Sequence, residues 1–246
     1  MDSQKSLIPS IVIGLSIIIT AAIFSHAYKK REKAHESIAV TGLGSRDFVS
    51  DLIVWEGEFT HSAIDLKQAY QLLNADRDAI KKYVSAKGVA EKEIIFSAVN
   101  ITKTMEDVFD NAGHIINRKF TGYLLNQHIK IESKNVEQIE NLSREVTELI
   151  NQGIEFNSEE PRYYYTKLAE LKVEMIAEAT KDATIRAGKI AENSNGKLGH
   201  LKNANMGVFQ IVGQNSGEDY SWGGKLNTSS KQKTASITIS ANFEIE

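Results

Sequence analysis

The chain of 246 residues has no cysteine and only two prolines, Pro9 and Pro161. Without cysteine it forms no disulfide and holds no iron–sulfur cluster, thiolate nucleophile or cysteine-ligated zinc. Because prolines are so few, no proline-rich linker divides the chain. The missing thiols do not identify a cellular compartment, since a cysteine-free chain is also compatible with an oxidising one.

A concentrated positive charge is also missing from most of the chain. The net charge is −3, and residues 1–35 carry five basic and two acidic side chains, which gives +3 there and −6 in the remainder. Nucleic acid is bound by a clustered cationic face. The acidic remainder therefore predicts that nucleic acid is not among the partners of this protein.

Motifs of known chemistry are incomplete or missing. Gly42-Leu43-Gly44 lacks the third glycine of a dinucleotide loop, because position 47 is aspartate, so a turn at a strand end is the better interpretation. Residues 213–217 read G-x-x-S-G, which differs from a nucleophile elbow and predicts a hairpin loop. The six histidines show no metal-ligand spacing, and no two carboxylates are paired by spacing. We predict no catalytic residue, cofactor or metal site.

What the chain does contain, at its start, is a long apolar run between Leu7 and Tyr28. About 20 apolar residues span a bilayer core as a helix. We therefore expect a transmembrane helix within residues 1–35, and a bilayer contact through residues 7–28. The residues expected to form this membrane anchor are Ile11, Ile13, Leu15, Ile18, Ile23 and Phe24.

Two other interpretations of this segment remain open. Ser25-His26-Ala27 is similar to a signal-peptide cleavage site, although the apolar run is long for a signal peptide. A buried core helix is disfavoured by the apolar residues on every side. The orientation of the segment in the membrane is also open. Lys29, Lys30 and Arg31 favour a cytoplasmic side for the remainder of the chain, which conflicts with an exported domain.

Residues 36–246 are expected to form one α+β domain. Alternating apolar residues predict strands at 36–44, 48–60, 93–104, 120–132, 206–212 and 234–245. In the second of these, Ile53, Trp55 and Phe59 would face a core. Helical spacing predicts helices at 65–88, 135–153 and 168–193, the first two capped by Asp65 and Asn135. The polar residues on one strand face favour a mainly antiparallel sheet, which about three helices accompany. The repeated strand–helix order suggests two weakly duplicated units.

The order of these segments resembles the SIMPL domain family, also called DUF541. The resemblance is carried by residues 38–44 (IAVTGLG), by the strand from Asp51, and by the alanine-rich helix at 177–191. Ser50 departs from the proline usual in the family. The resemblance implies an exported, envelope-associated bacterial protein of α+β fold without agreed activity, linked loosely to stress and to homo-oligomeric assembly. We therefore expect a bacterial inner-membrane protein, single-pass, with its domain in the periplasm.

Aromatic residues supply the candidate partner or ligand surface. Tyr163, Tyr164 and Tyr165 are consecutive, and Tyr220 and Trp222 lie in a polar, glycine-rich loop at 213–227. Exposed aromatic side chains are enriched at interfaces. The alternative for the tyrosine run is a strand whose side chains alternate between core and surface.

Three functions are compatible with these features, in order of preference. The first is a self-assembling, ring-like homo-oligomeric structural or stress-related protein without catalytic activity. The second is a ligand- or partner-binding module of the envelope that uses the tyrosines or the 213–227 loop. The third is a hydrolase with an unrecognised carboxylate site.

Overall fold

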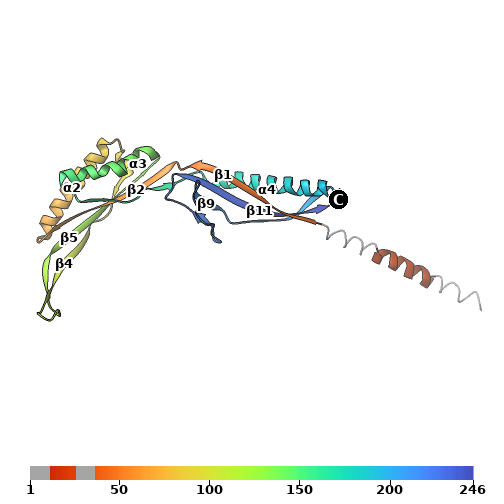
Figure 1. The fold of residues 1–246 in the computed structure, drawn as a ribbon, viewed down its shortest axis with the longest axis horizontal. Helices are drawn as coiled ribbons and strands as arrows, with labels where there is room; N and C mark the ends of the chain where they lie inside the picture. Colours follow the sequence, from red (N-terminus) through yellow and green to blue (C-terminus); the bar gives the residue numbers. More distant parts are fainter. Residues whose placement is uncertain (1–11, 26–36, 246) are drawn as a thin grey trace, which may run out of the picture. The chain divides into compact units, whose positions relative to one another are not determined.

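The computed structural model of the chain describes residues 12–25 and 37–245. Most of them fall into two compact units. Unit 1 comprises residues up to Ser45, Lys172–Phe209, and those from Ser236 onward, while unit 2 comprises Arg46–Leu171 and Gln210–Ala235. Three elements pass from one unit into the other, namely β1 (Ser37–Val49), α4 (Leu168–Asn193) and β11 (Gln232–Ile245) (Figure 1).

The predicted transmembrane helix is wrong. The described part of this segment, residues 12–25, is helical. No helix within the described residues is long and apolar enough to cross a membrane. The predicted single-pass location in the inner membrane depended on that helix and is corrected with it.

The side chains named for the membrane anchor lie within the described residues 12–25, with one exception. Ile11 and part of the predicted 7–28 contact lie outside the described residues. The other five anchor residues are exposed, and they are Ile13, Leu15, Ile18, Ile23 and Phe24.

Unit 2 is built on a six-stranded sheet in the order β3-β5-β2-β6, in which β4 also pairs with β5 and β7 with β2. Every pairing in this sheet is antiparallel, as predicted. The strands are β2 (Leu52–Ala63), β3 (Ile94–Phe96), β4 (Asn100–Phe109), β5 (Ile115–Ser133), β6 (Phe156–Ser158) and β7 (Arg162–Tyr164).

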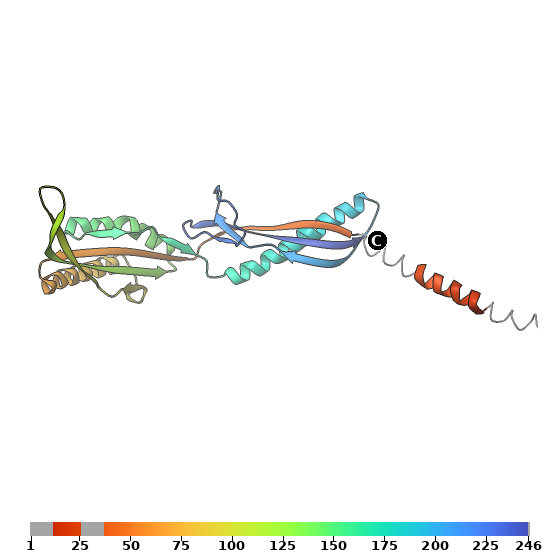
Figure 2. The ribbon, with the colours of Figure 1, turned by 90° about the horizontal axis from the view of Figure 1, so that it is seen from below.

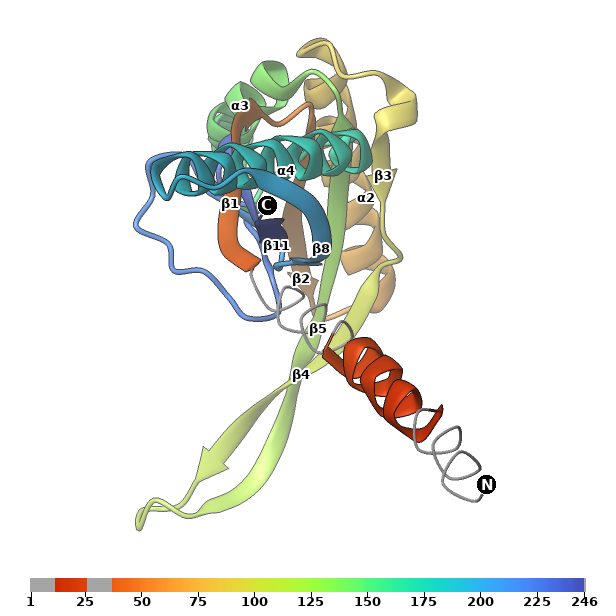
Figure 3. The same ribbon diagram turned by 90° about the vertical axis from the view of Figure 1, so that its right-hand side faces the viewer.

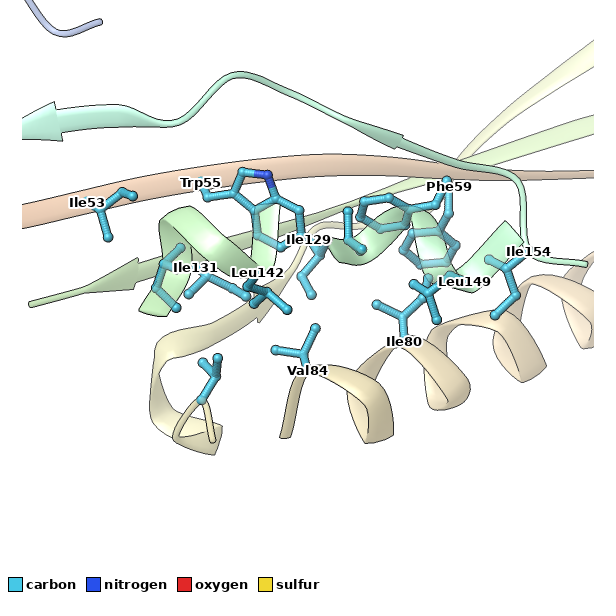
Figure 4. Packing of buried hydrophobic residues seen from close by; sticks show 14 of the residues in the cluster. Ile53, Trp55, Phe59, Ile80, Val84, Ile129, Ile131, Leu142, Leu149 and Ile154 are labelled. Carbon is cyan, nitrogen blue, oxygen red and sulfur yellow. The ribbon is translucent and has the colours of Figure 1, made fainter. Parts of the chain in front are cut away.

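One face of this sheet is covered by helices α2 (Leu66–Ala86) and α3 (Val136–Glu145), and by the 3-10 helix η2 (Val146–Gln152) (Figure 4). Ile53, Trp55 and Phe59 of β2 are fully buried there, which confirms the predicted core face. The indole of Trp55 donates to Ser158 Oγ at 3.0 Å, so its one polar atom is satisfied. Strand side chains alternate between the two sides, and on the opposite face they are mainly polar, as at Glu56 and Glu58.

The predicted start of α2 is confirmed, and that of α3 is only partly right. Asp65 Oδ1 accepts a hydrogen bond from the backbone N–H of Gln68 at 2.9 Å, as an N-cap does. Asn135 stands at the N-cap of α3 but its side chain makes no capping hydrogen bond. Gly88 and Gly153 follow their helices with positive φ, the left-handed conformation that glycine adopts at helix ends.

Unit 1 consists of strands β1, β8 (Leu198–Met206) and β11 with α4 lying along them (Figure 2). Gly42 and Gly44 face α4 from inside β1, where an added Cβ would collide with the backbone of Met175 and Ala179. The predicted turn at these glycines is therefore wrong, because the strand continues to Val49. The alanine-rich helix therefore lies close to the backbone of β1.

The strands between residues 198 and 227 also differ from the prediction. The strand predicted at 206–212 is two strands, β8 ending at Met206 and β9 (Gln210–Gly213) beginning after a break. At the break, the N–H of Gly207 bonds to the carbonyl of Thr238 on β11. β9 pairs in parallel with the short β10 (Lys225–Leu226), which lies inside the predicted 213–227 loop.

Candidate interaction surface

The most distinctive surface of unit 2 is the far end of the β4–β5 hairpin, which projects beyond the rest of the sheet (Figure 3). We call residues 104–121 the ribbon. Its ladder runs from Thr104 opposite Gly122 to Phe109 opposite Ile115. The turn is organised by Asp110, whose Oδ1 accepts the N–H groups of Ala112 and His114 at 2.8 and 2.9 Å. The hydrogen bond from His114 is the main reason that the pKa of Asp110 is lowered.

Apolar side chains are exposed along the ribbon. The exposed fractions of Met105 and Phe109 are 53% and 57%, and those of Ile115 and Phe120 are 52% and 41%. The register pairs Met105 with Phe120 and Phe109 with Ile115, so these four side chains share one face. Between these two apolar pairs, Arg118 and Asp107 form an ion pair, with Nε of Arg118 2.9 Å from Oδ1 of Asp107. The face is thus mainly apolar, with one pair of charges.

The edges of the ribbon are unpaired as well. β4 pairs with β5 alone within the described residues, and β2 pairs with β5 no farther than Tyr123. A two-stranded hairpin by itself is marginal in water, and a free apolar edge favours pairing with another strand. The ribbon therefore has the properties of a surface that another chain covers.

A shallow cavity of about 480 Å³ lies at the base of the ribbon. Its lining has no carboxylate, histidine or lysine. The residues that line it are Ser62, Ala63, Ile64, Thr104, Thr121, Gly122, Tyr123 and Leu124. Such a lining offers hydroxyl groups and apolar contact, but no acid or base for catalysis.

The tyrosine run does not form an aromatic ladder. Tyr163 is buried, while Tyr164 and Tyr165 are half-buried. Tyr165 packs against Phe48, with ring centroids 4.8 Å apart. Burial, together with the neighbouring Glu140, raises the pKa of the Tyr163 hydroxyl. Tyr163 therefore belongs to the core, whereas Tyr164 and Tyr165 are only partly covered, and the alternation between core and surface is not clear-cut.

Tyr220 and Trp222 are presented by an ordered loop between β9 and β10. Their exposed fractions are 68% and 100%. The amide of Gln210 holds the loop, donating to the carbonyl of Ser221 at 2.6 Å and accepting its N–H at 3.2 Å. Glu218 accepts the N–H of Gly213 at 3.1 Å. Both aromatic side chains are therefore accessible on a loop that side chains hold in place.

The charged cluster near Tyr163 does not resemble an acid–base site. Glu140 lies 3.0 Å from Nζ of Lys231 and 2.7 Å from the guanidinium of Arg144. Burial opposes its charged form, but the hydrogen bond and charge of Lys231, helped by Arg144, hold the pKa of Glu140 below its usual range. A carboxylate kept ionised by two cations is a poor proton donor. No group of three metal-ligating side chains occurs within residues 12–25 and 37–245.

The ribbon is the feature that the sequence prediction missed. Strands were expected to end at 104 and to begin at 120, whereas β4 ends at Phe109 and β5 begins at Ile115. The missed signal is local, because Asp110-Asn111-Ala112-Gly113 is a turn sequence between two segments that read as strands. Apolar and polar side chains are exposed on both faces of these segments, so their sequence lacks the regular alternation that predicts a strand.

Comparison with known proteins agrees with the predicted resemblance. The family model described as SIMPL, protein of unknown function (DUF541), matches residues 38–245. No curated protein matches the chain. Since the match covers both units from β1 to β11, the chain belongs to the SIMPL (DUF541) family.

Proposed function

We propose that this protein is a non-enzymatic structural protein that assembles with copies of itself, and that the ribbon is the surface through which it does so. The observation that carries the proposal is the exposed apolar face of the ribbon, whose two strand edges have no partner among the described residues. Covering that face removes apolar surface from water, and pairing the edges satisfies backbone groups.

The absence of catalysis belongs to the same proposal. The clustered carboxylates that we considered have structural partners: Asp107 pairs with Arg118, Asp110 organises the turn, and Glu140 is held by Lys231 and Arg144. The net charge of −6 beyond residue 35 supports the further expectation that nucleic acid is not a partner.

A shortened ribbon tests the proposal. In this variant, residues 106–119 are replaced by Asn-Gly, a two-residue hairpin turn that joins the cross-strand neighbours Met105 and Phe120. The buried core contains no residue of the removed segment, so the variant should fold with a similar melting temperature. We expect the full chain to be an oligomer and the variant a monomer in analytical ultracentrifugation. An unchanged native mass would reject the ribbon as the assembly surface.

A second candidate function is partner binding through the 213–227 loop, favoured by the fully exposed Trp222. The matched control for the ribbon variant is therefore Tyr220→Ala/Trp222→Ala. Both side chains are exposed, so their removal should leave the fold intact. If the double variant became monomeric while the shortened ribbon did not, the loop would replace the ribbon as the assembly surface.

A further inference from the structure

The strand β4 is regular along its whole length, which matters for how it can pair. The ladder between β4 and β5 has two irregularities, and in both the extra residue is on β5, namely Thr121 and Ile116. β4 is therefore continuous from Asn100 to Phe109. Its odd-numbered residues share one face, because strand side chains alternate.

The outer edge of β4 is free for a second strand. β5 occupies one edge, and β4 has no other pairing within the described part of the chain. The side chains of β4 are mostly exposed, with Ile101 at 51% and Met105 at 53%. Strand addition at such an edge is a common way for chains to associate.

The sequence of β4 is self-complementary in one antiparallel register. In an antiparallel pair, directly opposite residues point to the same face of the sheet. If the two strands are copies related by a two-fold axis, the axis must therefore lie between the two copies of one residue, and each register is named by that residue. With the axis at Met105, Lys103 lies opposite Asp107 of the second copy, and Ile101 lies opposite Phe109. Each of these pairs occurs twice. The other face then pairs Thr104 with Glu106 and Thr102 with Val108, so no like charges meet.

Neighbouring registers lose this match. An axis at Thr104 places Lys103 opposite Met105 and Asp107 opposite Ile101. An axis at Glu106 places Lys103 opposite Phe109 and Met105 opposite Asp107. Axes at Lys103 or Asp107 bring two like charges together, which is unfavourable for residues directly opposite each other.

Within one copy, Asp107 remains able to take a second partner. Arg118 Nε contacts its Oδ1 at 2.9 Å, and a carboxylate accepts several hydrogen bonds on two oxygens. Lys103 is exposed on the same face. The two charges needed between copies are therefore both available.

We propose that two copies of this chain join β4 to β4 as antiparallel strands with Met105 opposite Met105, forming a continuous sheet from β5 of one copy to β5 of the other. This register rests on the proposed self-association through the ribbon and specifies its partner and its geometry.

The cysteine-free chain allows a direct test with single cysteines. Directly opposite Cα atoms are about 4.5–5.5 Å apart, within the range of a disulfide. In full-length protein under mild oxidation, Met105→Cys should give mostly a disulfide-linked dimer. Thr104→Cys is the matched control, because in this register Thr104 lies opposite Glu106 and the two copies of position 104 are about 8 Å apart. Equal or faster cross-linking of Thr104→Cys would overturn the register.

Charge exchange provides a second test. Lys103→Asp alone and Asp107→Lys alone should each raise the dissociation constant at least tenfold. An equimolar mixture of the two should restore association, because the mixed dimer again has opposite charges facing each other. A defect caused only by loss of the contact between Asp107 and Arg118 would not be repaired by mixing, so restored association identifies the pairing between copies. Lys103→Asp leaves that contact intact, and a dissociation constant raised no more by Lys103→Asp than by Glu106→Lys would overturn the proposed pairing. Glu106→Lys is the control and should change the dissociation constant less than twofold.

The two proposals fail in different ways. A monomeric full chain in the native-mass measurement would reject both self-association and the register. An oligomer that disappears with the shortened ribbon, but cross-links no better at position 105 than at 104, would reject the register alone.

Discussion

A lysine in unit 2 shows how strongly burial can shift the pKa of a side chain. Lys233 is 2% exposed, and its ammonium group donates to the backbone carbonyl of Tyr163 at 2.5 Å. Burial lowers the pKa of Lys233 to about 8, because the charged form is removed from water. A neighbour two positions away, Lys231, is instead paired with Glu140. Sequence composition does not distinguish these two lysines.

This lowered pKa predicts a pH-dependent stability. Between pH 8 and 10.5 the unfolded chain keeps a proton that folded Lys233 has released, so the free energy of unfolding rises with pH. Relative to Lys233→Met, we expect the wild type to gain up to about 1.4 kcal/mol per pH unit in this range. Below pH 8 the difference should be constant. Urea unfolding from pH 7 to 10.5 measures it, with the exposed Lys82→Met as control, and a flat difference would contradict the prediction.

Asp51, part of the family resemblance, holds two segments of unit 2 together through hydrogen bonds. Its two carboxylate oxygens accept the N–H and the hydroxyl of Thr166, both at 2.7 Å. The residue before it is Ser50, where the family usually has proline. The carboxylate therefore connects the start of β2 to the segment that precedes α4.

At the scale of elements, the contact between β1 and α4 depends on residue size. Ala179, Ala183 and Ala187 are fully buried on the helix. Gly42 on the strand lies against Ala179 and Ala183, and Gly44 lies against Met175 and Ala179. The backbone N–H of Leu43 donates to Asp182 Oδ2 at 2.8 Å, and this bond, followed by that of Arg186, lowers the pKa of the Asp182 carboxyl. Small side chains and one carboxylate thus bring the helix close to the strand.

Gly42→Ala should therefore destabilise the fold. The new Cβ would meet the backbone of Ala179 and Ala183, where the neighbours are main-chain atoms that cannot move aside. Overpacking of this kind costs about 1–3 kcal/mol. Thermal and urea unfolding measure the loss. Gly217→Ala is the matched control, since nothing lies within 4 Å of its added Cβ. Equal stability of the two variants would show that α4 can shift without cost.

Elements with one buried face were the easiest to predict. The core side of β2, the position of α2 and the cap at Asp65 follow from local sequence patterns, and the structure confirms them. The ribbon was missed because both its faces are exposed, so it lacks the alternation of buried and solvated residues. The glycines of β1 were misinterpreted because their reason is a helix more than 130 residues away in the chain.

At the scale of the whole molecule, self-association links stability to concentration. If the ribbon is covered only in the oligomer, assembly stabilises the folded state by mass action. We expect the melting temperature of the full chain to rise by several degrees between about 1 and 100 µM. The variant with the shortened ribbon should melt at a constant temperature. Differential scanning calorimetry measures both, and parallel behaviour of the two proteins would argue against a role of the ribbon in assembly.

Sequence information was sufficient to predict the family, the absence of thiol chemistry, the antiparallel pairing of strands in unit 2 and the core face of β2, because composition and short-range periodicity carry this information. Three-dimensional contacts were needed to show which charges are buried, which glycines touch a helix, and which strands extend beyond the core. It also corrected the spanning helix within the described residues. These features depend on contacts between distant segments and on the ends of elements, which periodicity does not define.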